Sequence, residues 1–260
     1  TNRVSVLSTG LNIDPIVVVQ KAVPGLYSDI SSVEIDTYLA ETAAALTVEH
    51  PDYSYLAARI KVNSLHKETP GFIIATKNLY DDGLLREEYF KKVMENADAI
   101  ESIIDYDKDY TFDYFALTTL IRAYLLKFDN RTIERPQDLW MRVTLTVTGN
   151  EFNLDKIKET YKSLSSGMYT HATPTLFNSG LKMQQLSSCF LIGMEDDSIE
   201  GIFNTIKDCA LISKTAGGIG MHAHNIRGSG SRIKSTNGKS NGLIPFLKIF
   251  NETAKSVDQG

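Results

Sequence analysis

The first two-thirds of the chain place apolar residues three and four positions apart, which is the spacing of amphipathic helices. This pattern predicts helices over residues 38–48, 53–67, 86–104, 115–127 and 154–164. The helix at 115–127 is apolar, so we expect it to be buried. Pro51, Pro70 and Pro136 separate the helical segments.

The pattern changes near Tyr169, where short apolar runs alternate with loops of Gly, Ser and Thr. It predicts a buried strand at 185–194, a helix at 197–215, a strand at 219–224, a loop at 227–240 and a third helical segment at 241–256. The expected inner stripe of the 197–215 helix is Ile199, Ile202, Phe203, Ile206, Ala210 and Ser213. Asp197 is suited to cap this helix, with Glu200 three residues later. Strand, helix and strand in this order predict the opening of an α/β sheet or barrel.

Composition narrows the class of protein. The 260 residues suit one large or two ordinary domains, and 42% of them are apolar. A net charge of −5 argues against a general nucleic-acid or membrane-surface binder. We find no apolar run of the roughly 18 residues that a membrane helix needs. The two cysteines, Cys189 and Cys209, favour a reducing cytoplasm over a secreted disulfide scaffold.

Residues 207–239 reverse the charge balance of the chain, because they hold six cations and a single acid, Asp208. The cations are Lys207, Lys214, Arg227, Arg232, Lys234 and Lys239. Glycines in the same segment allow backbone N–H groups to approach an anion. The segment therefore has two possible interpretations, a phosphate-binding loop or an ordinary solvated loop. A P-loop is excluded, because Ile233 stands where its first glycine is required.

The cysteines and histidines carry weaker signals. Cys189 lies in a predicted strand, where a lone cysteine is more often a core residue than a reactive one. Cys209 lies in the middle of a predicted helix, and we interpret it as packing. His222 and His224 alternate on a strand and share one face. Because a third ligand is missing there, we predict no metal site.

Longer motifs resemble a known family. They are Thr173–Gly180 (TPTLFNSG), Gln185–Leu191 (QLSSCFL), Ser213–Gly220 (SKTAGGIG) and Val257–Gly260 (VDQG). The chain resembles the large subunit of class I ribonucleotide reductases in its eukaryotic form. The resemblance implies an α-helical N-terminal region, a remnant of an ATP-cone plus a helical domain, followed by the start of a ten-stranded α/β barrel. Their expected bounds are 1–70, 71–165 and 166–260.

The same resemblance implies a radical reduction of ribonucleoside diphosphates to 2′-deoxyribonucleoside diphosphates, for DNA precursor synthesis. It makes Cys189 catalytic: the thiol helps remove the 2′-hydroxyl and then forms a disulfide with a second cysteine. It also implies substrate contacts at Thr173, Ser188 and Gly218, and Thr173 replaces a serine found in many eukaryotic members.

Two regulatory sites are implied as well. A specificity site for deoxynucleoside triphosphates is expected at Asp197, Ser198, Ile199, Lys214, Arg227, Lys234, Ser235, Asp258 and Gln259. A second site for ATP or dATP is expected at Ser32, Asp36 and Lys67, in a module whose opening hairpin has no counterpart in this sequence.

The implied partners are a second large subunit, a small diiron-tyrosyl subunit that supplies the radical, and thioredoxin or glutaredoxin as the reductant. Mg²⁺ is expected to accompany the nucleotide phosphates. The thiyl-forming cysteine and other catalytic groups of the family would lie beyond Gly260, so we expect this chain to be inactive alone. The alternative is a regulatory fragment that binds nucleotides without catalysis.

Overall fold

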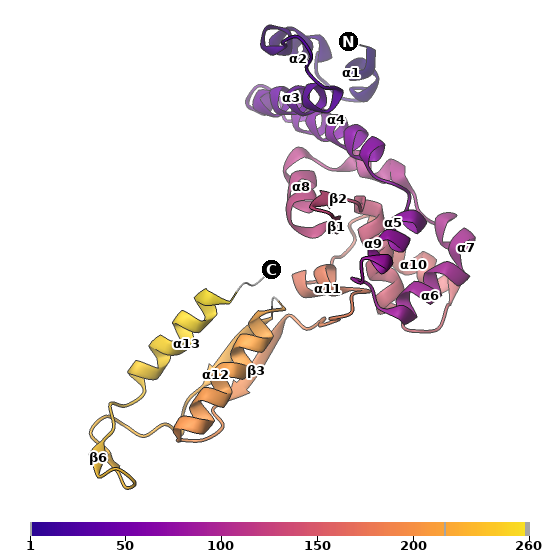
Figure 1. Ribbon diagram of the computed structural model, residues 1–260. Helices are drawn as coiled ribbons and strands as arrows, with labels where there is room; N and C mark the ends of the chain where they lie inside the picture. Colours follow the sequence, from indigo (N-terminus) through magenta and orange to yellow (C-terminus); the bar gives the residue numbers. More distant parts are fainter. Residues whose placement is uncertain (1, 216, 258–260) are drawn as a thin grey trace. The chain divides into compact units, whose positions relative to one another are not determined.

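The structure is a computed structural model that describes residues 2–215 and 217–257 (Figure 1). Internal contacts divide the chain into two compact units. Unit 1 comprises residues 1–170 and 180–182, and unit 2 comprises residues 171–179 and 183–260. Within the described residues, no helix combines the length and apolar character needed to cross a bilayer.

Unit 1 is helical apart from one short hairpin. Its elements are α1 (Asn2–Leu7), α2 (Pro15–Ala22), η1 (Val23–Gly25), α3 (Ser32–Ala45), η2 (Leu46–Val48), α4 (Asp52–Glu68), α5 (Phe72–Asp81), α6 (Glu87–Glu95), α7 (Ala97–Glu101), η3 (Tyr106–Thr111), α8 (Tyr114–Thr119), η4 (Leu120–Tyr124), β1 (Lys127–Phe128), β2 (Arg131–Thr132), α9 (Pro136–Val147) and α10 (Leu154–Ser165). The helices predicted at 53–67 and 154–164 are confirmed as α4 and α10.

Local capping decides where α3 begins. It starts at Ser32, six residues before the predicted start, because Ser31 and Glu34 form a capping box. The Ser31 hydroxyl accepts the Glu34 N–H at 3.2 Å, and the Glu34 carboxylate accepts the Ser31 N–H at 2.9 Å. Two N–H groups without intrahelical partners are thereby satisfied.

Two predicted helices of unit 1 differ from the structure. The helix expected at 86–104 is broken at Asn96, which separates α6 from α7 and has φ −126°. The helix expected at 115–127 ends at Tyr124 as a π turn, and Lys127 already lies in the β1–β2 hairpin. It is also not buried throughout, because Phe115 is 77% exposed while Leu117 is enclosed.

Helix α9 forms the centre of the second half of unit 1. Every residue from Pro136 to Leu145 is buried. Several polar members of this run have partners: Arg142 donates to Glu134, and Gln137 accepts a hydrogen bond from Tyr161 at 2.8 Å, whereas the buried Thr144 hydroxyl has none among the described residues. A helix that is buried on all sides shows no amphipathic period, which is why the pattern did not predict it.

Asp138 is the fully buried carboxyl group of α9. Its Oδ1 accepts the Tyr106 hydroxyl at 2.6 Å, and its Oδ2 accepts the Arg135 N–H at 2.8 Å. Burial nevertheless raises the pKa of Asp138 to about 8, from 3.8. A carboxyl whose pKa is raised on folding contributes stability below its unfolded pKa and loses it as the pH rises through the folded value.

We therefore expect the free energy of unfolding to fall between pH 4 and pH 8, and to fall less in Asp138→Asn. Urea denaturation followed by the fluorescence of Trp140, the only tryptophan, measures this in unit 1. An equal fall in both proteins would contradict a titrating Asp138.

Unit 2 contains helices and a pair of parallel strands. Its elements are α11 (Thr173–Asn178), β3 (Cys189–Gly193), α12 (Ile199–Ser213), β4 (Gly218–His222), β5 (Arg232–Ile233), β6 (Gly238–Lys239) and α13 (Ile244–Ser256). Strands β3 and β4 pair in parallel and are connected through α12, so the predicted strand–helix–strand order is confirmed. In the described residues this sheet has two strands and is not closed.

The core of unit 2 lies on one face of the β3–β4 pair. Met194, Ile202 and Ile206 form it, and Met221 and Phe246 pack against it. The expected inner stripe of α12 is partly wrong, because Ile199 is 67% exposed and Phe203 is 49% exposed. Cys209 is buried, as its interpretation as a packing residue predicts.

The strand predicted at 185–194 is shorter than expected and only half-buried. Exposure alternates along β3, and Leu191 is 95% exposed. The predicted cap of α12 is also wrong, because Ser198 caps the helix by accepting the Gly201 N–H at 3.0 Å. The loop expected at 227–240 contains the β5–β6 hairpin.

Candidate functional site: a cationic cavity and an exposed cysteine

A cavity of about 520 Å³ lies in unit 2 beside the start of α12. The residues around it come from the start of α12, the segment after β4, the β5–β6 hairpin and α13. They are Asp197, Ser198, Ile199, Ile202, Ile226, Arg227, Arg232, Ile233, Lys234, Ser235, Ser240 and Phe246. This volume is in the range of small-molecule sites.

Two residues that line the cavity, Asp197 and Arg227, form an ion pair. Arg227 donates from Nε to Asp197 Oδ2 at 2.6 Å and from a terminal nitrogen to the Asp197 carbonyl at 3.0 Å. The pair is partly accessible, with side chains 35% and 25% exposed. A ligand beside this pair meets both a cation and an acceptor, and it can exchange contacts with either group.

Two further cations face the cavity from the hairpin. Arg232 and Lys234 line it, and neither has an ion-pair partner among residues 2–215 and 217–257. Pairing of Arg232 with Lys239 in the hairpin holds the loop in place. Gly242 lies against the segment that leads into this loop, and it can do so only because it has no side chain: a Cβ there would lie 2.8 Å from the Ser229 nitrogen. Guanidinium and ammonium groups gathered in one cavity suit an anionic ligand such as a phosphate.

The cavity also has an apolar part, which comes from Ile202, Ile226, Ile233 and Phe246. The first residue of α12, Ile199, and its cap, Ser198, line the cavity too, so the positive end of the helix dipole lies beside it. An apolar wall beside cations fits a ligand that has a flat ring at one end and negative charge at the other.

The structure brings together most of the predicted specificity-site residues. Six line the cavity: Asp197, Ser198, Ile199, Arg227, Lys234 and Ser235. Lys214 does not, because it follows the last residue of the 15-residue helix α12, roughly 22 Å from the start. Asp258 and Gln259 lie outside the described residues. Arg232 was not among the predicted site residues, although its place in the basic loop was a signal for it.

Cys189 begins strand β3 and is exposed. Its interpretation as a core residue from the sequence pattern is therefore wrong. It lies in register with Gly218 of β4, and the Gly218 N–H donates to the Ser188 carbonyl at 2.8 Å. A Cβ at Gly218 would lie 3.6 Å from the Cys189 Sγ. The absence of a side chain at Gly218 leaves the thiol open on that side.

Two hydrogen bonds join helix α11 to the segment that leads into β3. The Thr175 hydroxyl donates to the Leu186 carbonyl at 3.0 Å, and the Asn178 amide donates to the Gln185 carbonyl at 2.8 Å. Thr173 is the first residue of this helix. The local contacts therefore hold Thr173, Ser188 and Cys189 within one connected part of unit 2.

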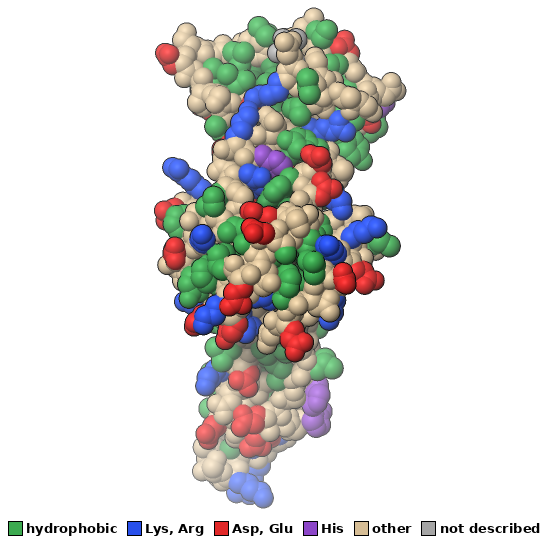
Figure 2. Space-filling model, turned by 90° about the vertical axis from the view of Figure 1, so that its right-hand side faces the viewer, with side chains coloured by type: hydrophobic (Ala, Val, Ile, Leu, Met, Phe, Trp, Pro, Cys, Tyr) green, Lys and Arg blue, Asp and Glu red, His purple; other side chains and the backbone are tan. Residues whose placement is uncertain are grey.

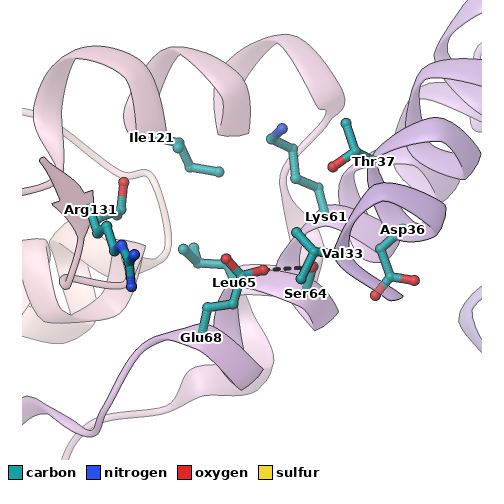
Figure 3. Close-up of a pocket in the computed structure, with 10 residues that line it drawn as sticks. Val33, Asp36, Thr37, Lys61, Ser64, Leu65, Glu68, Ile121 and Arg131 are labelled. Carbon is teal, nitrogen blue, oxygen red and sulfur yellow. Dashed lines mark hydrogen bonds between the residues drawn. The ribbon is translucent and has the colours of Figure 1, made fainter. Parts of the chain in front are cut away.

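The predicted second nucleotide site lies in unit 1. Asp36 is buried, its carboxylate contacts Arg3, and the Lys67 Nζ lies 3.5 Å from its Oδ2. Ser32 lies one helical turn before Asp36 on α3. Asp36 also lines a cavity of about 490 Å³, together with Lys61, Glu68 and Arg131 (Figure 3). Neither Ser32 nor Lys67 lines that cavity.

Figure 3 shows α4 contributing four side chains to this cavity: Lys61, Ser64, Leu65 and Glu68. The Ser64 hydroxyl donates to Glu68 at 2.9 Å. Acidic and basic groups are thus mixed around the cavity. The face drawn in Figure 2 shows the same mixing, with acidic and basic side chains interspersed. Among the described residues, no three His, Cys, Asp or Glu side chains gather as a metal site.

Comparison with known protein families matches two segments in the second part of the chain. Residues 110–184 match the all-alpha domain of ribonucleotide reductase, and residues 187–260 match its barrel domain. The chain therefore belongs to the ribonucleotide reductase family.

Its relatives are large subunits. The whole chain is 47% identical to the ribonucleoside-diphosphate reductase large chain 2 of Saccharomyces cerevisiae, of which it covers 31%. It is 46% identical to the large subunits of Arabidopsis thaliana and variola virus, of which it covers 33% and 35%. The chain spans about a third of the length of these curated relatives, and it is related to them throughout.

Proposed function

We propose that this chain is part of the large, catalytic subunit of a ribonucleoside-diphosphate reductase. In the proposed reaction a ribonucleoside diphosphate and two thiols give a 2′-deoxyribonucleoside diphosphate, one disulfide and water. The 2′-hydroxyl leaves as water, and the two electrons come from the thiols. The relatives that carry this activity in their names match the whole chain, and the chain covers about a third of each.

Cys189 is the proposed catalytic residue of this chain. A thiol is able to give a proton to the departing hydroxyl and then an electron pair on forming a disulfide. Its exposure and the side-chain-free Gly218 opposite it support this role, because a substrate needs open space beside the sulfur. Thr173, Ser188 and Gly218 are the proposed substrate contacts, with hydroxyl or backbone groups that bind ribose or diphosphate.

The observation that carries the proposal is the cationic cavity in unit 2. Three separate segments bring six predicted specificity-site residues around it, with Arg232 as a further cation. We propose that a deoxynucleoside triphosphate binds there as an effector. Arg227, Arg232 and Lys234 bind the phosphates, Asp197 accepts a hydroxyl of the sugar, and the apolar wall contacts the base.

Lys214, Asp258 and Gln259 complete the proposed specificity site. Because Lys214 lies at the far end of α12, it reaches a shared site only when it comes from a second copy of the chain. A homodimer supplies that copy. Asp258 and Gln259 are proposed to signal between the effector and the substrate.

Mg²⁺ is proposed to enter with the triphosphate. The cavity offers one carboxylate, Asp197, and Arg227 already engages it. The residues present therefore fit a magnesium ion held by phosphate oxygens and water rather than by the protein. A small diiron-tyrosyl subunit is the proposed source of the radical, and thioredoxin or glutaredoxin the proposed reductant.

Residues 1–70 are proposed to be an ATP-cone-like module, residues 71–165 a helical domain and residues 166–260 the first part of the barrel. Ser32, Asp36 and Lys67 are the proposed ATP or dATP contacts in the module. The ion pair between Asp36 and Lys67 supports this, because it places a cation beside the first turns of α3.

Arg227→Ala is expected to weaken the binding of dTTP to this chain by about 10–100-fold. A hydrogen bond to a charged group contributes about 1.5–3 kcal/mol, and the substitution also leaves Asp197 without its cation. Arg232→Ala is expected to weaken binding in the same direction. Titration calorimetry at fixed salt measures both affinities.

Lys255→Ala is the matched control, because Lys255 is an exposed cation of α13 that pairs with Glu252 and does not line the cavity. Its affinity for dTTP should equal that of the unsubstituted chain. If Arg227→Ala and Lys255→Ala bind dTTP equally well, the cavity is not the effector site.

A further inference from the structure

We propose that His222 and His224 form a two-histidine site for a divalent transition metal ion, with Ni²⁺ and Cu²⁺ preferred over Zn²⁺. The proposal is independent of the reductase assignment, because it uses neither the thiol nor the cationic cavity. It also goes beyond the expectation from the sequence, in which the lack of a third ligand excluded a metal.

The two rings meet at the end of strand β4. His222 is its last residue, and His224 follows two positions later on the same side. Both side chains are exposed, and their Nδ1 atoms lie 2.9 Å apart. The ring centroids are 4.5 Å apart, with 65° between the ring planes.

The backbone around the pair is held by the core of unit 2. Met221 and Ala223, on either side of His222, pack on the apolar cluster beneath the strands. The Met194 N–H donates to the His222 carbonyl at 3.1 Å, and the Asn225 amide donates to the Met194 carbonyl at 3.2 Å. Ligands on such a framework lose little freedom when they bind a metal.

The His222 ring lies beside Gly193 of β3. Gly193 lies opposite His222 in the parallel register, and a Cβ there would be 3.5 Å from a ring carbon of His222. That distance is an ordinary van der Waals contact, so the carbon edge of the ring lies close to β3 while its Nδ1 lies beside His224.

The separation of the two nitrogens favours one coordination geometry. Two nitrogens bound at roughly 2.0–2.1 Å and at a right angle to one metal lie about 2.9 Å apart, whereas a tetrahedral angle gives about 3.3 Å. The observed 2.9 Å matches the right angle of tetragonal Ni²⁺ and Cu²⁺. Imidazole suits both ions. The same distance also fits a hydrogen bond between two neutral rings, so the experiment must separate these states.

Water would fill the remaining coordination positions. Among the described residues there is no third His, Cys, Asp or Glu within reach of the pair. Cys189 is on the same strand pair but lies in register with Gly218, four residues before His222 and roughly 13 Å away along the strand. The site should accordingly bind metal more weakly than a structural site with four protein ligands.

Titration calorimetry of this chain with Ni²⁺ alone tests the proposal, in a Cys189→Ala background that removes the exposed thiol as a competing ligand. We expect one Ni²⁺ per chain. His222→Ala and His224→Ala should each weaken Ni²⁺ binding by at least about 10–100-fold. Loss of a residue that only hydrogen-bonds to a metal ligand has an effect of that size, and here the ligand itself is removed. His50→Ala, a histidine of unit 1 beside Asp52, should leave the affinity unchanged.

Equal Ni²⁺ affinity in the background chain and in its His222→Ala and His224→Ala variants would overturn the proposal and leave the rings as a hydrogen-bonded pair. Tighter binding of Zn²⁺ than of Ni²⁺ would overturn the assigned geometry. Because both side chains are exposed, the variants should remain folded, and their circular dichroism spectra check this directly.

Discussion

Cys189→Ser in a full-length large subunit carrying this sequence is expected to abolish deoxynucleotide formation. Serine keeps the size and one hydrogen-bonding hydrogen, but it is a much weaker acid and cannot form a disulfide. The loss should exceed the roughly 10²–10⁴-fold that removal of a general acid costs, because the electrons for the reduction are lost as well. The measurement is the conversion of a labelled ribonucleoside diphosphate in the presence of the small subunit and a thiol reductant.

Cys209→Ser is the control for this experiment. Cys209 is buried in the middle of α12, and burial raises the pKa of its thiol, so it is suited to packing rather than to chemistry. Its variant should retain turnover, and Cys189→Ser should retain dTTP binding in the separate cavity. Normal turnover by Cys189→Ser would remove the residue from the mechanism.

Arg142→Met is expected to lower the free energy of unfolding of unit 1 by about 3–5 kcal/mol, because it leaves the charge of Glu134 buried without a partner. Arg142 Nε lies 2.5 Å from Glu134 Oε1, and both side chains are 2–3% exposed. Glu134 also accepts the Leu126 N–H at 2.9 Å, so its carboxylate stays in place when the arginine is lost. Urea denaturation followed by Trp140 fluorescence measures the change, since Trp140 lies on the same helix.

A second variant separates the buried charge from a mere loss of packing. Glu134→Gln combined with Arg142→Met removes both charges and keeps an acceptor for the Leu126 N–H, so it should recover most of the lost stability. Lys91→Ala removes an exposed ion pair with Glu87 and should leave the transition midpoint unchanged. If the double variant is as unstable as Arg142→Met, the buried charge is not the cause.

The helices that the sequence predicted well are those with one apolar face. In α10, the buried residues Ile157, Tyr161 and Leu164 lie four and three positions apart, and the predicted range of 154–164 differs from the observed one by a single residue at its end. The strand predicted at 219–224 is observed as β4, which begins one residue earlier and ends two residues earlier. These patterns arise because each element has one face in the core and one in solvent. Apolar and polar residues therefore recur along the sequence with the period of the helix or strand.

Helix α9 shows where this reasoning ends. It is enclosed on all sides, and Arg142, Asp138 and Gln137 make hydrogen bonds to Glu134, Tyr106 and Tyr161 from other elements. No local period marks such a helix, and a run containing Gln, Asp and Arg does not look buried in a sequence. Long-range hydrogen bonds make that burial possible, and they exist only in the folded chain.

The candidate sites were likewise predicted in part from the sequence and in part only from the structure. Motifs in the sequence named Cys189 and the residues of the basic loop, and family resemblance gave them roles that the sequence pattern alone did not. The ion pair of Asp197 required the structure: local rules made this residue a helix cap and the resemblance made it a specificity-site residue, but only the fold places it beside Arg227, 30 residues later, at the cavity. Ser198 caps the helix in its place.

Periodicity in the sequence was enough to find most helices and strands with one buried face, and the residue types showed which side chains are available for thiol and phosphate chemistry. The exposure of Cys189 beside Gly218, the place of Arg232 at the cavity and the close approach of the His222 and His224 nitrogens became apparent only in the fold. The physical reason is that periodicity reports a residue's own exposure, whereas a site depends on distances between segments, which strand register and loop packing set.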